Sequence, residues 1–97
     1  MLTNAQKQYL RGLAHHLDPI FQVGKAGVGT NMLQQLGSAL EVRELFKVSV
    51  LKNCEESPAD VGKVIASALD AEIVQVIGRV IVLYRESREH KKIVLPR

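Results

Sequence analysis

Apolar residues recur at helical spacing in three stretches of the chain, and each stretch predicts a helix. Thr3 or Asn4 caps the first helix, which ends before Asp18 because the proline that follows disfavours a helical residue in front of it. The second helix begins near Thr30 or Asn31. The expected helices span residues 4–16, 30–41 and 59–69, with apolar stripes at Leu10, Leu13, Ala14 and Leu17, at Leu33, Leu36 and Leu40, and at Val61, Val64, Ile65, Ala68 and Leu69.

Other stretches carry strand patterns. Residues 44–52 alternate, so the apolar side chains from Phe46 onward point to one face and Lys47 points to the other. The pattern over residues 72–85 predicts a hairpin whose turn, at Gly78 and Arg79, needs a positive φ. Its second arm is apolar throughout, which predicts a central strand covered on both faces. Residues 20–23 are a further short strand, and residues 93–96 are a candidate closing strand.

The resulting order is α-β-α-β-α-β-β, which predicts an α/β fold with a mixed four-stranded sheet. Strand–helix–strand units imply parallel neighbours, and the final hairpin adds an antiparallel pair. We expect residues 1–97 to form one compact domain. A chain of 97 residues rarely holds a deep substrate cleft as well as a core, so a binding module is favoured over an enzyme.

Composition predicts a cytoplasmic domain. The polar first ten residues lack the apolar core of a signal peptide, and no apolar run reaches the ~20 residues of a membrane span. The single cysteine, Cys54, excludes an internal disulfide and is interpreted as a passive thiol.

Charge is distributed unevenly along the chain. Residues 1–52 carry a net +3, residues 53–72 carry −4, and residues 73–97 carry +4. This separation predicts a basic face, an acidic face and a charged partner. Cations on the first helix, the glycine-rich loop, the open strand face and the hairpin suit a phosphate backbone: Lys7, Arg11, Lys25, Lys47, Arg79 and Arg85.

The loop VGKAGVGTN, residues 23–31, holds three glycines and a lysine between an expected strand and an expected helix. A nucleotide P-loop has its lysine after the last glycine, and a dinucleotide fingerprint has a third glycine where Met32 stands, so both motifs fail. What remains is a Gly-x-x-Gly motif, in which glycines let the backbone approach a phosphate and a lysine adds charge. The motif also fits a tight turn that only needs positive φ. Its residues are Gly24, Lys25, Ala26 and Gly27.

The aromatic residues are few, and they favour structured RNA as the nucleic acid. Phe21 and Phe46 fall in apolar strand patterns and are expected in the core. The chain therefore lacks a paired aromatic platform on which single-stranded bases could stack.

No grouping of residues predicts catalysis or metal binding. His15 and His16 are adjacent and diverge by about 100 degrees on a helix, and no Cys/His spacing resembles a zinc site. Glu41 and Glu44 flank a helix end and are interpreted as surface or capping charges. We expect no catalytic residue, no metal and no cofactor.

Three segments together resemble the YhbY-like bacterial members of the chloroplast RNA splicing and ribosome maturation (CRM) domain family. They are QKQYLRGLAHHLDPIFQVGKAGV, ALEVRELFKVSVL and VQVIGRVIVLYRES, and the resemblance extends over residues 6–96. It implies a fold similar to the C-terminal domain of bacterial translation initiation factor three. It also implies RNA binding through the Gly-x-x-Gly loop and association with precursors of the large ribosomal subunit. Relatives carry one glycine fewer before the threonine, so Gly29 is a departure from the family pattern.

The leading hypothesis is a monomeric, non-catalytic protein that binds structured ribosomal RNA during assembly of the large subunit, with no small-molecule substrate and no membrane. The alternative is a protein-interaction module whose acidic segment, residues 53–72, docks a basic partner. A nucleotide-using enzyme is the third hypothesis, and the failed nucleotide motifs argue against it.

Overall fold

The computed structural model describes residues 2–97, which contain three helices and four strands in the order α-β-α-β-α-β-β. The elements are α1 (Asn4–Ala14), β1 (Pro19–Val23), α2 (Thr30–Arg43), β2 (Leu45–Val50), α3 (Pro58–Leu69), β3 (Glu72–Ile77) and β4 (Val80–Tyr84). The predicted order of elements and the α/β class are confirmed.

The four strands form one mixed sheet in the order β1-β2-β4-β3. β1 pairs with β2 in parallel, whereas β4 lies between β2 and β3 and is antiparallel to both. The predicted hairpin and the central place of β4 are therefore confirmed. Gly78 in the hairpin turn has a φ of 57°, which a glycine adopts without strain. The crossover through α3 does not join parallel neighbours as expected, because β4 separates β2 from β3.

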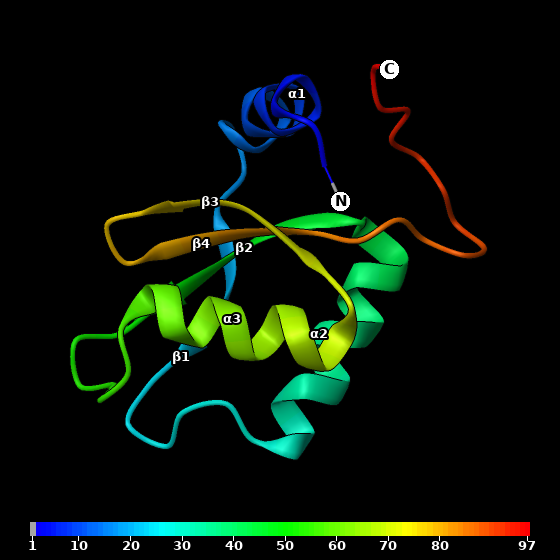
Figure 1. Cartoon of the computed structure of the whole chain (residues 1–97). Helices are drawn as coiled ribbons and strands as arrows, with labels where there is room; N and C mark the ends of the chain where they lie inside the picture. Colours follow the sequence, from blue (N-terminus) through cyan, green and yellow to red (C-terminus); the bar gives the residue numbers. More distant parts are fainter. Residues whose placement is uncertain (1) are drawn as a thin grey trace.

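Both faces of the sheet are covered (Figure 1). α2 and α3 lie on one face and α1 lies on the other. Phe46, Val48 and Val50 of β2 join the larger core beneath α2 and α3, as their alternation predicts. Leu45 points the other way, into a smaller core that includes Leu10 of α1. The alternating pattern of β2 thus separates two cores, and it leaves Lys47 half-buried on the α1 side.

Helix ends follow from local capping. The Thr3 hydroxyl accepts the Gln6 N–H at 3.1 Å, and the Gln6 side chain accepts the Thr3 N–H at 3.0 Å, so Thr3 is the cap of α1. α1 ends at Ala14, earlier than expected, and Leu13 and Leu17 of its predicted stripe remain exposed.

Residues 93–96 do not form the candidate closing strand. Ile93 and Leu95 still pack against the smaller core. The backbone N–H groups of Lys92 and Ile93 both donate to the Glu44 carboxylate, at 2.7 and 2.8 Å, in place of a strand ladder. A side chain distant in sequence therefore binds this segment.

Candidate nucleic-acid interface

Three connections lie at one edge of the sheet. β1 and β2 are parallel, so their carboxyl ends lie at the same edge, and Ser49 near the end of β2 pairs with Val80 at the start of β4. The loop of residues 24–29, the loop of residues 51–57 and the hairpin turn therefore lie together. We call this the loop edge of the sheet.

The Gly-x-x-Gly motif forms a hydrogen-bonded turn at this edge. The Gly27 N–H donates to the Gly24 carbonyl at 2.9 Å, and Gly27 has a φ of 71°. The turn exposes Lys25 and Ala26. The positive φ expected for a tight turn is thus present, and the same turn presents the lysine to solvent.

Gly29, the departure from the family pattern, is the N-cap of α2. It is extended, with a φ of −99°, and no side chain caps the helix there, in contrast to Thr3 of α1 and Ser57 of α3. A Cβ on Gly29 would meet nothing within 4 Å, so the space around this helix start is open. α2 begins at Thr30, which decides between the two expected starts.

Arg79 also lies at the loop edge, but its guanidinium binds the protein backbone. Nε donates to the Val50 carbonyl at 2.8 Å and one terminal nitrogen donates to the Leu51 carbonyl at 2.9 Å. These bonds fasten the hairpin turn to the end of β2. Sequence reasoning identified the charge of Arg79 but not these acceptors.

Arg85 lies at the opposite end of β4. Its two terminal nitrogens donate to the Leu69 carbonyl at 2.9 Å and the Gly37 carbonyl at 3.1 Å. The side chain therefore connects the end of α3 to the middle of α2. The structure does not bring Arg85 together with the Gly-x-x-Gly turn.

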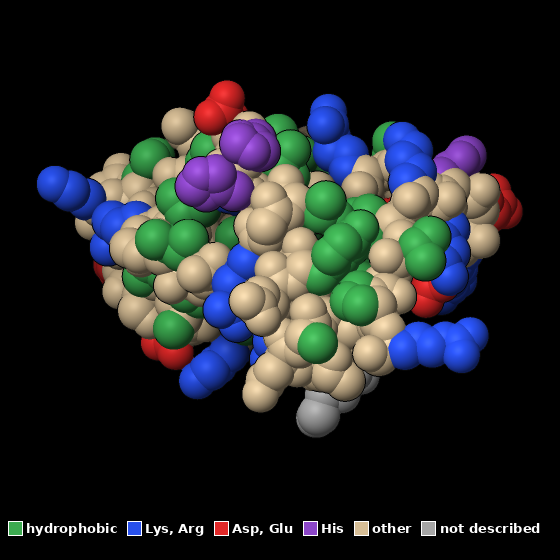
Figure 2. Space-filling view, turned by 90° about the horizontal axis from the view of Figure 1, so that it is seen from above, with side chains coloured by type: hydrophobic (Ala, Val, Ile, Leu, Met, Phe, Trp, Pro, Cys, Tyr) green, Lys and Arg blue, Asp and Glu red, His purple; other side chains and the backbone are tan. Residues whose placement is uncertain are grey.

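The remaining sequence candidates belong to the α1 side of the sheet. Lys7 and Arg11 lie on α1, with Lys7 half-buried and Arg11 exposed. Lys47 lines a cavity of about 320 Å³ together with His15 and Ile77. Lys and Arg side chains on this face are spread out, with hydrophobic side chains between them (Figure 2). The basic residues thus form a loop-edge group and an α1-side group, and not one patch.

The acidic segment, residues 53–72, does not form a single surface either. Glu55, Glu56 and Asp60 are exposed around the start of α3, and Asp70 lies beyond its far end. A helix of 12 residues separates the two groups by about 18 Å. Glu72 is half-buried and accepts the Leu2 N–H at 3.0 Å. The exposed acidic side chains of this segment therefore form two groups, and Glu55, Glu56 and Asp60 belong to the one at the start of α3.

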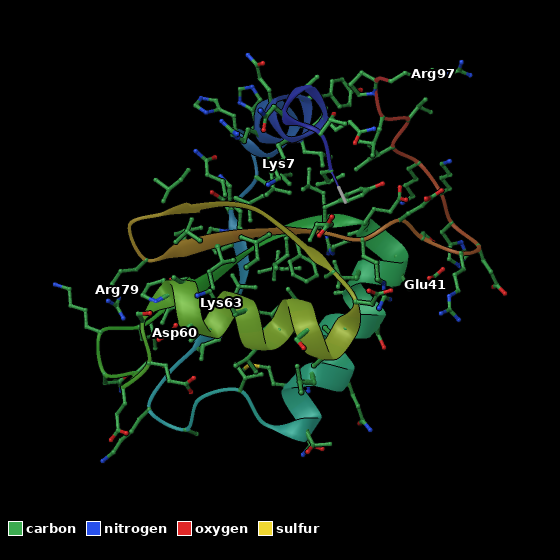
Figure 3. All side chains as sticks on the ribbon, in the orientation of Figure 1. Lys7, Glu41, Asp60, Lys63, Arg79 and Arg97 are labelled. Carbon is green, nitrogen blue, oxygen red and sulfur yellow. The ribbon has the colours of Figure 1, made fainter. Side chains whose placement is uncertain are left out.

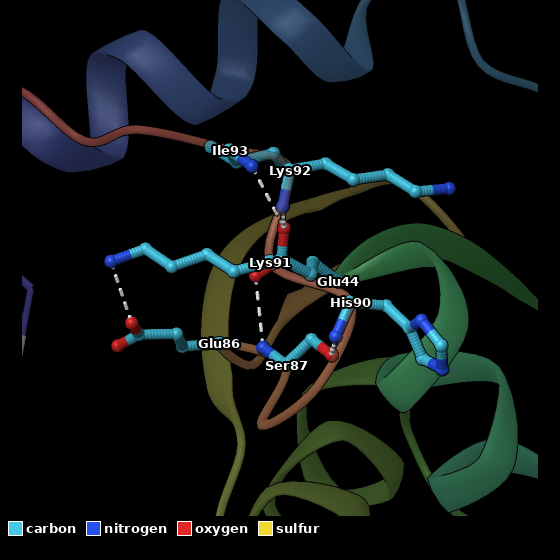
Figure 4. Close-up of polar contacts among 7 residues, drawn as sticks. All are labelled: Glu44, Glu86, Ser87, His90, Lys91, Lys92 and Ile93. Carbon is cyan, nitrogen blue, oxygen red and sulfur yellow. Dashed lines mark hydrogen bonds and ion pairs between the residues drawn. The ribbon is translucent and has the colours of Figure 1, made fainter.

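Glu44 is where the sequence interpretation was wrong. It is fully buried and not a surface charge, and it has a φ of 65°. Its carboxylate accepts the N–H groups of Ser87, Lys92 and Ile93 at 2.7 to 2.8 Å (Figure 4). Glu44 lies 43 to 49 residues before its three donors, so no local pattern revealed the contact.

Glu41, one helical turn earlier, binds the same C-terminal segment. It accepts the Ser87 hydroxyl at 2.6 Å and the backbone N–H groups of Arg88 and Glu89, both at 3.0 Å. Figure 3 places Glu41 at the end of the sheet opposite Arg79. The two glutamates are therefore acceptors for the segment that follows β4, remote from the loop edge.

These hydrogen bonds lower the pKa of both carboxyl groups. The Ser87 hydroxyl, followed by the two backbone donors, lowers the pKa of Glu41 to about 2. Burial raises the pKa of Glu44, but its three backbone donors outweigh burial and hold the pKa below the ordinary value. Both groups are ionised at neutral pH and act as acceptors only.

Comparison with known proteins identifies the family. A family model described as the CRS1 / YhbY (CRM) domain matches residues 2–85. The chain belongs to this family. The resemblance drawn from the three sequence segments is confirmed.

Relatives share the full length of this CRM domain. It is 57% identical to the probable RNA-binding protein YqeI of Bacillus subtilis, covering 99% of this chain and 100% of that protein. It is 42% identical to an RNA-binding protein of Haemophilus influenzae, covering 99% and 96%. The solution structure of a hypothetical protein of Staphylococcus aureus matches with a TM-score of 0.82 and 52% identity, over 99% of this chain and 100% of that one.

Two negative findings bear on other kinds of site. Within residues 2–97, no helix of the CRM domain is both long and apolar enough to span a bilayer. Across that same range, no group of three or more His, Cys, Asp or Glu side chains is arranged to hold a metal ion.

Acidification is expected to release the C-terminal segment before the CRM domain unfolds. Both glutamate pKa values are depressed, so the binding they provide is complete above the unfolded pKa of about 4.5 and is lost as the pH falls through the folded pKa, which is about 2 for Glu41. The amide resonances of Ser87, Arg88 and Ile93 report this release in an NMR titration. Resonances that collapse above pH 5, or an Arg88 resonance that persists unchanged below pH 2, contradict the assignment. Glu41→Gln removes the titrating carboxyl group, so the Arg88 resonance no longer follows this titration.

Arg79→Ala is expected to lower the free energy of unfolding by about 1–2 kcal/mol, because two strand-end carbonyls lose a charged donor. Lys25→Ala, at the exposed tip of the neighbouring turn, is the matched control and stays within about 0.5 kcal/mol. Urea denaturation measures both. Equal effects of the two substitutions contradict the structural role of Arg79.

Proposed function

We propose that this CRM domain is a non-catalytic RNA-binding protein that contacts structured ribosomal RNA in precursors of the large ribosomal subunit. The observation that carries the proposal is the exposed Gly24–Gly27 turn leading into a helix without a side-chain cap. The names of the Bacillus subtilis and Haemophilus influenzae relatives support RNA as the partner. Residues 1–97 act as one monomeric binding domain in the cytoplasm.

The loop edge binds phosphate through backbone and charge together. The backbone N–H groups of Lys25 and Ala26 belong to the two exposed residues at the tip of the turn and are offered to a phosphate oxygen. The positive end of the α2 dipole favours an anion near Gly29. The Lys25 ammonium adds a charge that needs no fixed geometry. A sugar-phosphate backbone satisfies all three requirements.

The other basic residues differ in whether their side chains are already hydrogen-bonded within the protein. Within residues 2–97 the side chains of Lys7, Arg11 and Lys47 make no ion pair or hydrogen bond, and they provide a second contact region for the RNA on the α1 side. Arg79 donates with two of its nitrogens to backbone carbonyls and offers its remaining donors to a phosphate. Arg85 belongs to the fold, because both of its terminal nitrogens are bound far from the loop edge.

Crosslinking in cells followed by sequencing of the bound RNA tests this function. We expect crosslinks concentrated on precursor ribosomal RNA of the large subunit, and we expect Lys25→Ala to reduce them. A crosslink map that avoids ribosomal RNA contradicts the proposed partner. Binding in vitro that does not depend on salt contradicts phosphate contact itself.

A further inference from the structure

A groove between β1 and α2 has a lining that the phosphate contacts do not use. It is open, has a volume of about 520 Å³, and is lined by Phe21, Asn31, Gln34, Gln35 and Ser38. The four polar residues follow the helical spacing i, i+3, i+4 and i+7, so they share one face of α2. No charged side chain lines the groove.

The amide side chains have unused hydrogen-bonding capacity. Asn31, Gln34 and Gln35 are exposed, and none of their side-chain amides hydrogen-bonds to another group within residues 2–97. Each amide offers two donor hydrogens and one acceptor oxygen, the complement that base edges require. A neutral amide also makes such bonds without the desolvation cost of a buried charge.

Phe21 adds a ring to this surface. The sequence placed it in the core, but it is only half-buried: one part of the ring packs on Phe46, with centroids 5.7 Å apart, and another part lines the groove. β1 is an edge strand, so no further strand covers this side of Phe21. An aromatic face of this kind stacks on any base.

The groove continues directly from the proposed phosphate contact. β1, the Gly24–Gly27 turn and α2 are consecutive, and Asn31 is the second residue of the helix that the turn precedes. From Asn31 to Ser38 the helix rises about 10 Å, which fits about three bases at the ~3.4 Å spacing of a stacked strand. An RNA strand whose phosphates bind at the turn would thus place its bases against the face of α2 that carries Asn31, Gln34 and Gln35, which we call the amide face.

We infer that this groove binds unpaired nucleotides of the RNA, with Asn31, Gln34 and Gln35 bonding to base edges and Phe21 stacking on a base. The inference rests on the proposed RNA-binding function and adds a class of substrate to it: a single-stranded loop or bulge within a structured RNA. The phosphate contacts alone bind any backbone, whereas the groove distinguishes unpaired bases from a closed duplex.

Three labelled RNAs of equal length test the inference: a hairpin with an unpaired loop, the same hairpin with abasic loop positions, and a perfect duplex. The intact domain is expected to bind the hairpin at least about tenfold more tightly than the other two. The triple variant Asn31→Ala, Gln34→Ala and Gln35→Ala loses this preference and keeps its duplex affinity and salt dependence. Alanine favours helix at these exposed positions, so the fold is retained. Phe21→Leu reduces the preference separately, because it keeps apolar volume and removes the ring.

The matched control is Gln8→Ala with Ser67→Ala, two exposed polar residues on α1 and α3, and it keeps the preference. Side-chain amide resonances of Asn31, Gln34 and Gln35 shift with the hairpin and not with the duplex. If all three RNAs bind equally and this binding depends on Lys25, the groove inference is overturned while RNA binding stands. The groove would then be a site for a protein partner. Binding to none of the RNAs overturns the proposed function itself.

Discussion

Glu44→Ala is expected to lower the free energy of unfolding by about 3 kcal/mol, the largest effect of any single substitution considered for this domain. The carboxylate is fully buried and accepts three backbone N–H groups from the segment after β4. Each buried donor left unpaired costs about 1–3 kcal/mol. The segment can detach and hydrate its own donors, which keeps the loss below the sum of the three. Urea denaturation measures it.

Variants at the same position separate the carboxylate from the backbone. Glu44 has a φ of 65°, and alanine is strained there as glutamate is, so Glu44→Ala reports the loss of the buried side chain with its acceptor and no change in backbone strain. Glu44→Gly removes the acceptor and the strain together, and recovers about 1 kcal/mol relative to alanine. Glu89→Ala changes an exposed glutamate of the same segment and stays within about 0.5 kcal/mol. A Glu44→Ala loss no larger than that of Glu89→Ala contradicts the assigned role.

The parts of the fold that the sequence predicted correctly depend on local signals. Alternation in β2, the Gly78 turn and the capping position of Thr3 each involve residues within a few positions of one another, and the structure confirms all three. The prediction of a strand at residues 93–96 was wrong. It rested on the local apolar pattern of the segment, whereas the carboxylate that accepts its hydrogen bonds lies far away in the sequence. Their neighbouring backbone donors bind Glu44, which lies 48 residues before Lys92.

In the candidate site, too, local signals were predicted correctly and contacts between distant residues were not. Glycines and a lysine in one short loop predicted the exposed turn, and its geometry follows from Gly27 alone. The sequence reported the charges of Arg79 and Arg85 correctly but could not reveal that backbone carbonyls of other elements accept their hydrogen bonds. The amide face of α2 was visible as a spacing of three and four residues, and sequence reasoning missed it because it followed apolar and charged residues only.

Lys25→Ala combined with Lys47→Ala is expected to weaken binding to structured RNA by about 100-fold at low salt, about tenfold for each lost phosphate contact. The two lysines represent the loop-edge and α1-side groups, and neither side chain makes a hydrogen bond or ion pair within residues 2–97. If about five phosphates are contacted, the logarithm of affinity falls with the logarithm of salt at a slope of roughly −4, and the double variant reduces this slope by about two. Filter binding over a series of salt concentrations measures both quantities.

Lysine is the better probe here, because substituting Arg79 would change stability and binding together. Lys92→Ala is the matched control: its side chain is exposed at the end remote from the loop edge, and only its backbone N–H binds Glu44. It should leave the affinity within about twofold and the slope unchanged. An additive loss from the two lysines means that one RNA contacts both groups at once. A loss from Lys25→Ala with none from Lys47→Ala confines the interface to the loop edge, and no loss from either contradicts phosphate contact at both groups.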